Sequence, residues 1–373
     1  MRKIHVDSLS PGMKVGRPVF NSRGQVLLNA GVELTKRYIE KLKVMGIPSL
    51  YIDDGFLSDV QVDDVITDEA RTNIKKKVRD FYTRLESEPS AAQTVIGMKD
   101  INNLVNEIID QLLESKDIVV NIMDIRTLDE YTFGHSVNVC VLALMTGIKL
   151  GYSKAKLYHL AMGALLHDVG KTCIPEHILN KPGKLTDEEF NEIKKHPNYG
   201  YEILIKNPCV SRLSALIAQQ HHERLNGDGY PYNLKDDEIH ELAKVTGMVD
   251  IYDALTADRV YRRALPPHEA YEMISACGDY YFDFHLVQAF LHNVAAFPSG
   301  SLVKLNTGET AGVIETFPGY TKQPKVRILL SSNGQPLKNK REIWLAEDYN
   351  VFITSVIDDE SELKLIKKKL SLN

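Results

Sequence analysis

The sequence has few cysteines, no excess of basic residues and no long apolar run, and each absence excludes a class of protein. Its 373 residues include four scattered cysteines with no CxxC pair. This usage argues for a reducing compartment and against a disulfide scaffold or a cysteine-based zinc site. Lys and Arg total 45 against 50 Asp and Glu, a net charge of −5. That balance excludes histone-like binding of bulk nucleic acid.

Membrane proteins and secreted proteins are also excluded, because the sequence lacks an apolar membrane span and a signal peptide. No stretch approaches the ~18–20 consecutive apolar residues that spanning a bilayer requires. The charged start of the chain is not followed by the apolar core of a signal peptide. We therefore expect a cytoplasmic protein without a membrane partner. Hydrophobic residues make up 43% of the chain, which is typical of an ordinary globular protein.

The pattern of residues changes along the chain and predicts five parts. Residues 1–53 alternate short apolar stretches with turns and predict a small α+β unit, in which 14–20 and 25–28 are strands and 35–44 a helix; 54–120 form linking or capping helices. Residues 121–297 are almost entirely helical, 298–360 form a small β-barrel-like unit, and 361–373 are a Lys-rich tail that forms a frayed helix. The fold class is mainly α, with a helical bundle between two small flanking units.

Two amphipathic helices in the second part allow two interpretations. Apolar residues recur at spacings of three and four over about 62–86 and 100–114. In the simpler interpretation, which we prefer, these helices cap the domain that follows. In the other, they form a signalling pair and make a homodimer through residues 62–114.

Histidines and aspartates in the helical part indicate a metal site. His167 and Asp168 follow an apolar helix that ends near Gly170, and His221 and His222 lead into a Gly-rich loop. A single histidine on an apolar face is more often a satisfied core residue than a ligand. Two helix ends that both terminate in ligand-type residues indicate instead a common point of convergence. The candidate ligands are His135, His167, Asp168, His196, His221, His222 and Asp250.

The types of donor atom in this set restrict the metal. Imidazole with carboxylate and without thiolate suits Fe, Mn, Co, Ni or Zn rather than Ca or Mg. Seven ligands exceed what one tetrahedral or octahedral ion requires, and a short carboxylate such as Asp168 can bridge two ions. The residues therefore predict a centre of two divalent transition metals.

Five segments, in order, resemble the HD-GYP family, a branch of the HD metal-dependent phosphohydrolases. They read HSVNV, HDVGK, HPNYG, HHERLNGDGYP and DIYDALTADRVYR, at 135–139, 167–171, 196–200, 221–231 and 250–262. A His-Asp pair alone is uninformative, but HDxGK, HHE and GYP in register are specific. The resemblance implies an HD-GYP catalytic domain over 121–297, a bundle of about five to seven helices. It also implies hydrolysis of the bacterial second messenger cyclic di-GMP to linear pGpG, and in some members on to GMP.

The resemblance implies a role for each site residue. The ligands of the first metal would be His135, His167, Asp168 and Asp250, with Asp168 also bridging to the second. The other ligands of the second metal would be His196, His221 and His222. Fe or Mn is the implied metal, although Zn, Ni and Co suit the same donors. Lys171 would contact the scissile phosphate. The residues lining the nucleotide site would be Lys171, Tyr230, Asp253, Arg259 and Arg262.

The chemistry of phosphodiester hydrolysis agrees with these roles. Two ions ~3.5–4 Å apart acidify a bridging water to hydroxide and neutralise the phosphate oxygens. Lys171, one turn from Asp168, can reach the phosphate or assist the leaving oxygen. Arg259 and Arg262 share a helix face that binds ligand in one interpretation and is simply solvated in the other. For Tyr230, packing within the turn is the alternative to contact with a base.

Departures from the family pattern affect the number of metals and the choice of function. Tyr131 stands where some members have a glutamate that binds a third metal, so we predict two metals and no third. Val260 replaces a common proline and Asn226 a common aspartate, but every predicted ligand is present. An active phosphodiesterase is therefore preferred. The alternatives are an HD phosphohydrolase acting on another nucleotide, such as cyclic GMP-AMP, or a regulatory protein that binds cyclic di-GMP.

Overall fold

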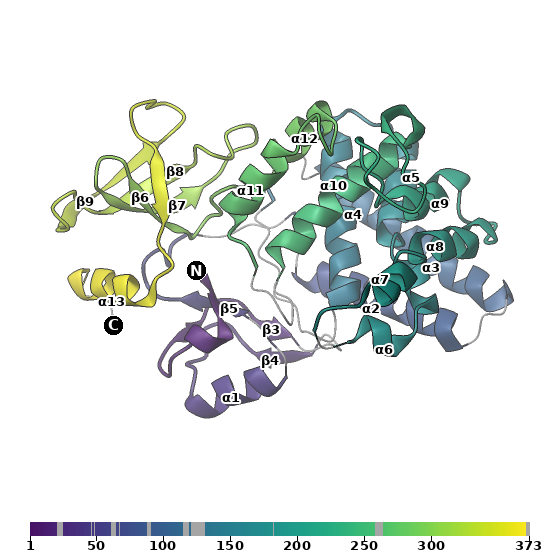
Figure 1. Ribbon diagram of the computed structural model, residues 1–373. Coiled ribbons are helices and arrows are strands. Elements are labelled where there is room, and N and C mark those ends of the chain that lie inside the picture. The colour runs from purple at the N-terminus through teal and green to yellow at the C-terminus, as the bar shows by residue number, and fades with distance from the viewer. Residues whose placement is uncertain are drawn as a thin grey trace. The chain divides into compact units, whose positions relative to one another are not determined.

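The chain folds into two compact units, shown in a computed structural model (Figure 1). One unit combines Met1–Asp64, Asp117–Tyr131 and His292–Asn373, and the other combines Val65–Lys116 and Thr132–Leu291. The five-part division of the sequence stays a prediction. The described residues are 1–20, 25–45, 47, 49–60, 65–66, 68–87, 91–114, 119–120, 131–181, 183–257 and 264–370.

The second unit is helical, which confirms the mainly α fold class. Within residues 121–297 the described helices, α4 to α12, outnumber the five to seven expected, because short helices such as α6 and α7 interrupt the connections. No helix in the described ranges is long and apolar enough to cross a membrane. The helices are α2 Asp68–Ser87, α3 Ala91–Glu114, α4 Tyr131–Lys149, α5 Lys154–Leu165, the 3₁₀ helix η3 Val169–Cys173, α6 Glu176–Leu179, α7 Asp187–Ile193, α8 His196–Ile205, α9 Arg212–Gln220, the 3₁₀ helix η4 Asp236–Glu238, α10 Glu241–Thr256, α11 Pro267–Ala276 and α12 Phe284–Leu291.

Helices α2 and α3 use their apolar faces inside this unit. Ile74 and Val78 of α2, and Leu104 and Ile108 of α3, are each at most 3% exposed. The two helices pack against each other, α2 also contacts η3, and α3 contacts α5. These contacts favour the capping interpretation, which stays a prediction, because the described apolar residues that suggested a dimer are covered within the chain.

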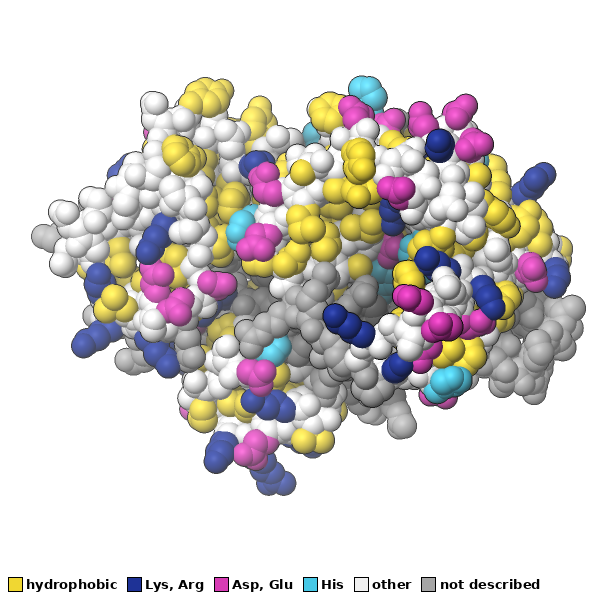
Figure 2. Space-filling model, in the orientation of Figure 1, with side chains coloured by type: hydrophobic (Ala, Val, Ile, Leu, Met, Phe, Trp, Pro, Cys, Tyr) yellow, Lys and Arg dark blue, Asp and Glu magenta, His cyan; other side chains and the backbone are white. Residues whose placement is uncertain are grey.

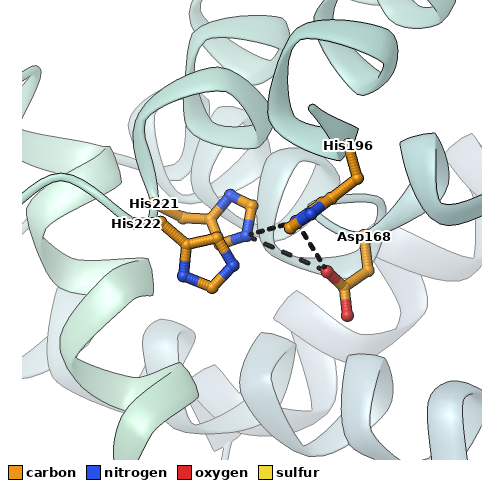
Figure 3. Close-up of side chains that lie close together, drawn as sticks. All are labelled: Asp168, His196, His221 and His222. Atoms are coloured by element: carbon orange, nitrogen blue, oxygen red, sulfur yellow. Dashed lines mark hydrogen bonds and ion pairs between the residues drawn. The ribbon is translucent and has the colours of Figure 1, made fainter. Parts of the chain in front are cut away.

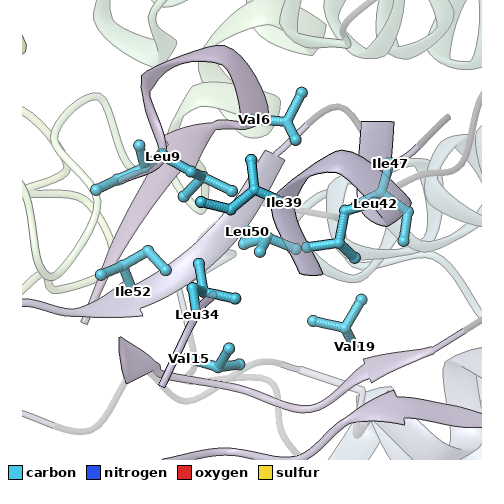
Figure 4. Close-up of a cluster of buried hydrophobic side chains, with 11 residues drawn as sticks. Val6, Leu9, Val15, Val19, Leu34, Ile39, Leu42, Ile47, Leu50 and Ile52 are labelled. Carbon is cyan, nitrogen blue, oxygen red and sulfur yellow. The ribbon is translucent and has the colours of Figure 1, made fainter. Parts of the chain in front are cut away.

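The N-terminal part of the first unit is a small α+β structure, as expected. Strands β1 and β2 flank β5 in an antiparallel sheet, β3 and β4 form a separate pair, and α1 begins after its N-cap Thr35. The strand expected over 14–20 is broken into two, because Pro18 has no backbone N–H for a ladder. Figure 4 shows the apolar core between α1 and the sheet. The elements are β1 Arg2–His5, the 3₁₀ helix η1 Val6–Ser8, β2 Lys14–Val15, β3 Val19–Phe20, β4 Val26–Leu28, α1 Lys36–Val44 and β5 Ser49–Asp53.

The C-terminal part of the same unit is a five-stranded antiparallel sheet in the order β10-β6-β7-β8-β9, which confirms the expected β-rich structure. The tail is a helix, α13, but it is docked and not frayed, since Leu363 and Ile366 are buried. They share a core with Phe56 and Leu57, which precede the helical unit in the sequence. The elements are β6 Leu302–Leu305, β7 Thr310–Glu315, β8 Lys325–Leu330, β9 Pro336–Trp344, β10 Ile353–Val356 and α13 Glu360–Lys369.

Charged side chains of both signs are scattered over the face in view in Figure 2. On the face in view, Lys and Arg are interspersed with Asp and Glu, so neither sign dominates it (Figure 2).

Candidate functional site

All seven predicted metal ligands lie together inside the helical unit. They come from α4, the α5–η3 junction, the start of α8, the end of α9 and the middle of α10. Their potential ligand atoms form two groups, and within each group the atoms lie within 4.8 Å of one another. The first group, drawn in Figure 3, is Asp168, His196, His221 and His222. The second group is His135, His167 and Asp250.

The carboxylate of Asp168 lies between the two groups. Its Oδ1 atom is 3.4 Å from His196 Nε2 and 3.9 Å from His221 Nε2 (Figure 3). Its Oδ2 atom is 3.4 Å from His167 Nε2 and 3.9 Å from His135 Nε2. Each oxygen therefore faces a different group, which is the geometry that a bridging carboxylate requires.

Three of the histidines are held in one tautomer by the backbone. Nδ1 of His167, His196 and His221 lies 2.7, 2.7 and 2.9 Å from the carbonyl oxygen three residues earlier. A carbonyl can only accept, so each Nδ1 carries a hydrogen and each Nε2 keeps a free lone pair. Those carbonyls belong to the last turns of α5, α7 and α9, which have no intrahelical donor. Local helix endings therefore orient the ligand atoms toward the centre.

His135 is oriented instead by a carboxylate. Its Nδ1 donates to Asp253 Oδ2 at 2.6 Å, and its Nε2 lies 3.0 Å from Asp250 Oδ1. Burial lowers the pKa of His135, but Asp250 and Asp253 outweigh burial and raise the pKa to about 10. Asp253 itself is 0% exposed. The resemblance assigned Asp253 to the nucleotide site, whereas the structure places it behind a candidate ligand and away from any accessible surface.

The residues present fit a bound cation. Nε2 of His167 and Oδ1 of Asp168 are buried and have no hydrogen-bond partner among the described residues. Leaving such an atom unpaired costs about 1–3 kcal/mol. In addition, Nε2 of His196 lies 3.4 Å from Nε2 of His221. Both of these atoms carry lone pairs in the tautomers fixed above, so a cation between them would remove an unfavourable contact.

Two of the histidines and the shared carboxylate have the charge state that a metal ligand needs. Burial lowers the pKa of His221 and His222 well below the usual range, with repulsion from neighbouring imidazoles adding to the effect. Both rings are therefore neutral, the form that binds a metal. Burial raises the pKa of Asp168, but His167 and Lys171 outweigh it and hold the pKa well below its usual range.

A glycine allows η3 and α8 to approach closely at the site. A Cβ atom on Gly170 would lie 2.0 Å from the carbonyl oxygen of His196 and 2.4 Å from the backbone nitrogen of Gly200. Both contacts are with backbone, so neither can be relieved by rotating a side chain. The glycine of the HDVGK segment therefore positions His196 against Asp168.

Gly170→Ala is expected to lower the free energy of unfolding by about 1–3 kcal/mol and to lower the metal content, because α8 must move away with His196. Denaturant unfolding of the metal-free protein and elemental analysis measure the two effects. Gly200→Ala is the matched control, since its Cβ would meet its nearest neighbours at 3.4 Å, an ordinary contact. Equal stability and metal content in both variants would contradict the packing argument.

Lys171 lies beside the shared carboxylate. Its Nζ donates to Asp168 Oδ2 at 2.6 Å, and its side chain is 31% exposed, so it links the buried centre to solvent. Tyr230 stacks on a ligand, with its ring 4.5 Å from that of His222 and tilted by 25°. This contact agrees with a packing role for Tyr230 in the loop.

The loop that carries Tyr230 is held by Glu223, the glutamate of the HHE motif, to which the sequence analysis gave no role. The Glu223 carboxylate accepts hydrogen bonds from the backbone N–H groups of Tyr232 and Leu234, at 2.7 and 2.9 Å. A Cβ on Gly229 would lie 2.4 Å from Cα of Glu223, so only glycine fits there. The signal was available, because Glu223 directly follows the two histidines.

Some predicted features lie outside the described residues. Arg259, Val260 and Arg262 belong to them, as does the side chain of Tyr131, on which the predicted absence of a third metal depends. Sequence reasoning also missed Asn138, which bonds to Asp253, and Arg71, which bonds to Asn138. Asn138 was detectable as a polar residue three positions after His135 in an otherwise apolar helix.

Comparison with known proteins gives two family matches. Residues 111–286 match the HD domain family, and residues 302–365 match a KOW domain associated with HD domain.

Curated relatives match parts of the chain. A cyclic di-GMP phosphodiesterase of Pseudomonas aeruginosa is 35% identical over 234 residues, which is 63% of this chain and 56% of that protein. A cyclic di-GMP phosphodiesterase response regulator of Xanthomonas campestris is 40% identical over 149 residues, 39% of each chain. A 3'3'-cGAMP-specific phosphodiesterase of Vibrio cholerae is 41% identical over 140 residues, 38% of this chain and 30% of that one. The chain thus spans about half the length, or less, of these relatives.

Proposed function

Because the chain belongs to the HD domain family and carries the HD-GYP motifs, we propose that it is a metal-dependent phosphodiesterase that hydrolyses cyclic di-GMP. The product is linear pGpG, or GMP where hydrolysis continues. The observation that carries the proposal is the position of Asp168, whose two oxygens face two separate groups of ligand atoms. Relatives named as cyclic di-GMP phosphodiesterases support the choice of substrate.

Two divalent transition metals would bind in this centre. His135, His167 and Asp250 would hold one, His196, His221 and His222 the other, and Asp168 would bridge them. Fe or Mn is the proposed metal, with Zn, Ni or Co suited to the same donors. When bound, such ions neutralise phosphodiester charge and make water more acidic.

The protein's own residues would orient the reaction. The Nδ1 bonds of the histidines keep their Nε2 atoms directed inward, and the buried walls exclude bulk water. The Lys171 ammonium, fixed beside Asp168, is the group that would meet a phosphate oxygen. It carries a proton at Nζ that the leaving oxygen can take, in the role of a general acid. Tyr230, stacked on His222, would close one side of the site.

A second substrate is favoured by a specific observation. The relative from Vibrio cholerae that is 41% identical over 140 residues is named for 3'3'-cGAMP. Cyclic GMP-AMP differs from cyclic di-GMP in one base, so it presents the same phosphodiester to the same centre. We therefore include it as the alternative substrate.

The experiment uses protein purified without oxygen. Metal content is measured by elemental analysis, and the protein is incubated separately with cyclic di-GMP and 3'3'-cyclic GMP-AMP before chromatography of the products. The expected result is pGpG or GMP with about two metals per chain. Asp168→Ala should give no product, whereas Asp237→Ala, which changes an exposed aspartate, should match the wild type.

Two other outcomes would change the assignment. Product from cyclic GMP-AMP alone would make that dinucleotide the substrate. Bound metal and bound cyclic di-GMP without product would favour a regulatory binding protein.

A cytoplasmic location and a homodimer through residues 62–114 stay predictions. Light scattering of the purified protein measures its oligomeric state.

A further inference from the structure

Arg71 of α2 is buried against α4, although α2 precedes residue 111, where the match to the HD domain begins. The residue is 8% exposed, and a buried guanidinium is unfavourable unless it is paired. Its Nη1 donates to Oδ1 of Asn138 at 2.6 Å. A charged side chain from outside the matched region therefore reaches a helix that carries a candidate metal ligand.

The hydrogen bonds continue from Asn138 to that ligand, and their directions are fixed. Nδ2 of Asn138 donates to Asp253 Oδ1 at 3.1 Å, and Asp253 Oδ2 accepts from His135 Nδ1 at 2.6 Å. A guanidinium only donates and a carboxylate only accepts, so the Asn138 amide cannot be reversed. The sequence Arg71, Asn138, Asp253, His135 therefore fixes the orientation of the His135 ring, with Nδ1–H on Asp253 and Nε2 toward Asp250 and Asp168.

This relay of hydrogen bonds, which runs from Arg71 through Asn138 and Asp253 to His135, is shielded from water. Exclusion of water strengthens each bond. Asn138 and His135 are each 3% exposed, and Asp253 is 0% exposed. Electrostatic interactions are stronger in such surroundings than in water. Without Arg71, the Oδ1 atom of Asn138 loses a donor, and the amide is no longer fixed with its Nδ2 group toward Asp253. Both changes loosen the hold of Asp253 on His135.

A second side chain of α2 also lies near the centre. Tyr82 follows Arg71 by eleven positions, about three helical turns, and so lies on the same face. It packs edge-on against Phe133 of α4, with 5.5 Å between ring centroids. Burial and the negative charge of Asp168 raise the pKa of Tyr82. The face of α2 that carries Arg71 therefore borders the site over three turns.

We propose that Arg71 is a positioning residue for the metal centre. Through Asn138 and Asp253 it sets the orientation of the His135 ring, so α2 is a required part of the centre and not only a cap. This inference rests on the proposed function, because it assumes that His135 binds a metal.

The test measures Mn²⁺ binding to metal-free protein by titration, with Arg71→Met compared against Lys76→Met. Lys76 is an exposed residue of the same helix, so the control removes an equal charge. Arg71→Met should weaken Mn²⁺ binding about 10-fold, and Asp253→Asn by about 10–100-fold, the range for residues that orient a ligand. Lys76→Met should leave binding unchanged. The Co²⁺ absorption spectrum, which reports the ligand set, should change in the first two variants only.

A double variant distinguishes a relay from two independent effects. Because Arg71 acts through Asp253, Arg71→Met combined with Asp253→Asn should bind Mn²⁺ no more weakly than Asp253→Asn alone. If Arg71→Met shows no cooperative thermal unfolding, it has not folded. Asn138→Ala then interrupts the same relay and should show the same loss of affinity.

The outcomes separate this inference from the proposed function. Wild-type protein that binds Mn²⁺, together with an Arg71→Met or Asn138→Ala variant that binds it equally well, would overturn the inference alone. Fully additive losses in the double variant would do the same. A wild-type protein that binds no Mn²⁺, Fe²⁺ or Co²⁺ would overturn both.

Discussion

Asp168→Ala is expected to lose turnover and most bound metal while it keeps its fold. The carboxylate faces both ligand groups, so its removal takes a ligand from each metal at once. The loss should exceed ~100-fold, the upper end for residues that only support a ligand. Elemental analysis gives the metal content, and product chromatography gives the rate.

The fold should survive because the packing around Asp168 comes from other residues. Leu160 and Leu165 of α5 and Val169 of η3 are fully buried apolar side chains that the substitution does not touch. Thermal unfolding of metal-free Asp168→Ala should therefore be as cooperative as that of the wild type. Wild-type turnover with a full complement of metal in this variant would show that the shared carboxylate has been assigned wrongly.

Lys171→Met should give the opposite division of effects, with metals retained and turnover lost. A general acid or a charge that meets the phosphate contributes typically about 10²–10⁴-fold. Methionine keeps the length of the side chain and removes the ammonium. Lys171 Nζ donates to Asp168 Oδ2 at 2.6 Å and so competes with a metal for that oxygen. Removing the ammonium should therefore leave metal affinity unchanged or slightly higher. Single-turnover rates and metal titration measure the two effects separately.

Lys154→Met is the matched control for Lys171. Lys154 also donates to an aspartate, Asp110 at 2.6 Å, but both side chains are 57% exposed. An exposed pair of this kind contributes little, so the control should keep wild-type turnover. If Lys171→Met instead loses its metals, then Lys171 supports the ligands and has no separate role at the phosphate.

The candidate ligands were predictable because their chemistry is visible in the residue types. Histidine and aspartate are common metal ligands, and five segments that carry them in the family's order leave few alternatives. The orientation of the rings was not predictable, although its cause is local. Each of His167, His196 and His221 bonds to a carbonyl three residues back, and this requires the helix to end at that position.

Features that depend on distant residues escaped prediction. Asp250 and Asp253 are three positions apart on α10, and periodicity gives them the same face. Only the packing of α4 decides that Asp250 reaches the centre while Asp253 lies behind His135. The burial of Arg71 escaped prediction for the same reason. A charged residue of an amphipathic helix is expected to be exposed to solvent until its buried partner is known. Strand β1 likewise needs β5, whose paired residues lie about fifty positions later.

The shared core of Phe56, Leu57, Leu363 and Ile366 has a consequence for the order of folding during synthesis. Its first members leave the ribosome roughly 240 residues before strand β6, a delay on the order of 10–50 s at the usual rate of translation. The last helix of the helical unit, α12, ends at Leu291, so that unit can fold while the other still lacks its five-stranded sheet. Nascent chains stopped where Leu291 has left the exit tunnel but strand β6 has not should therefore protect the helical unit from protease while the segment around Phe56 is still cut.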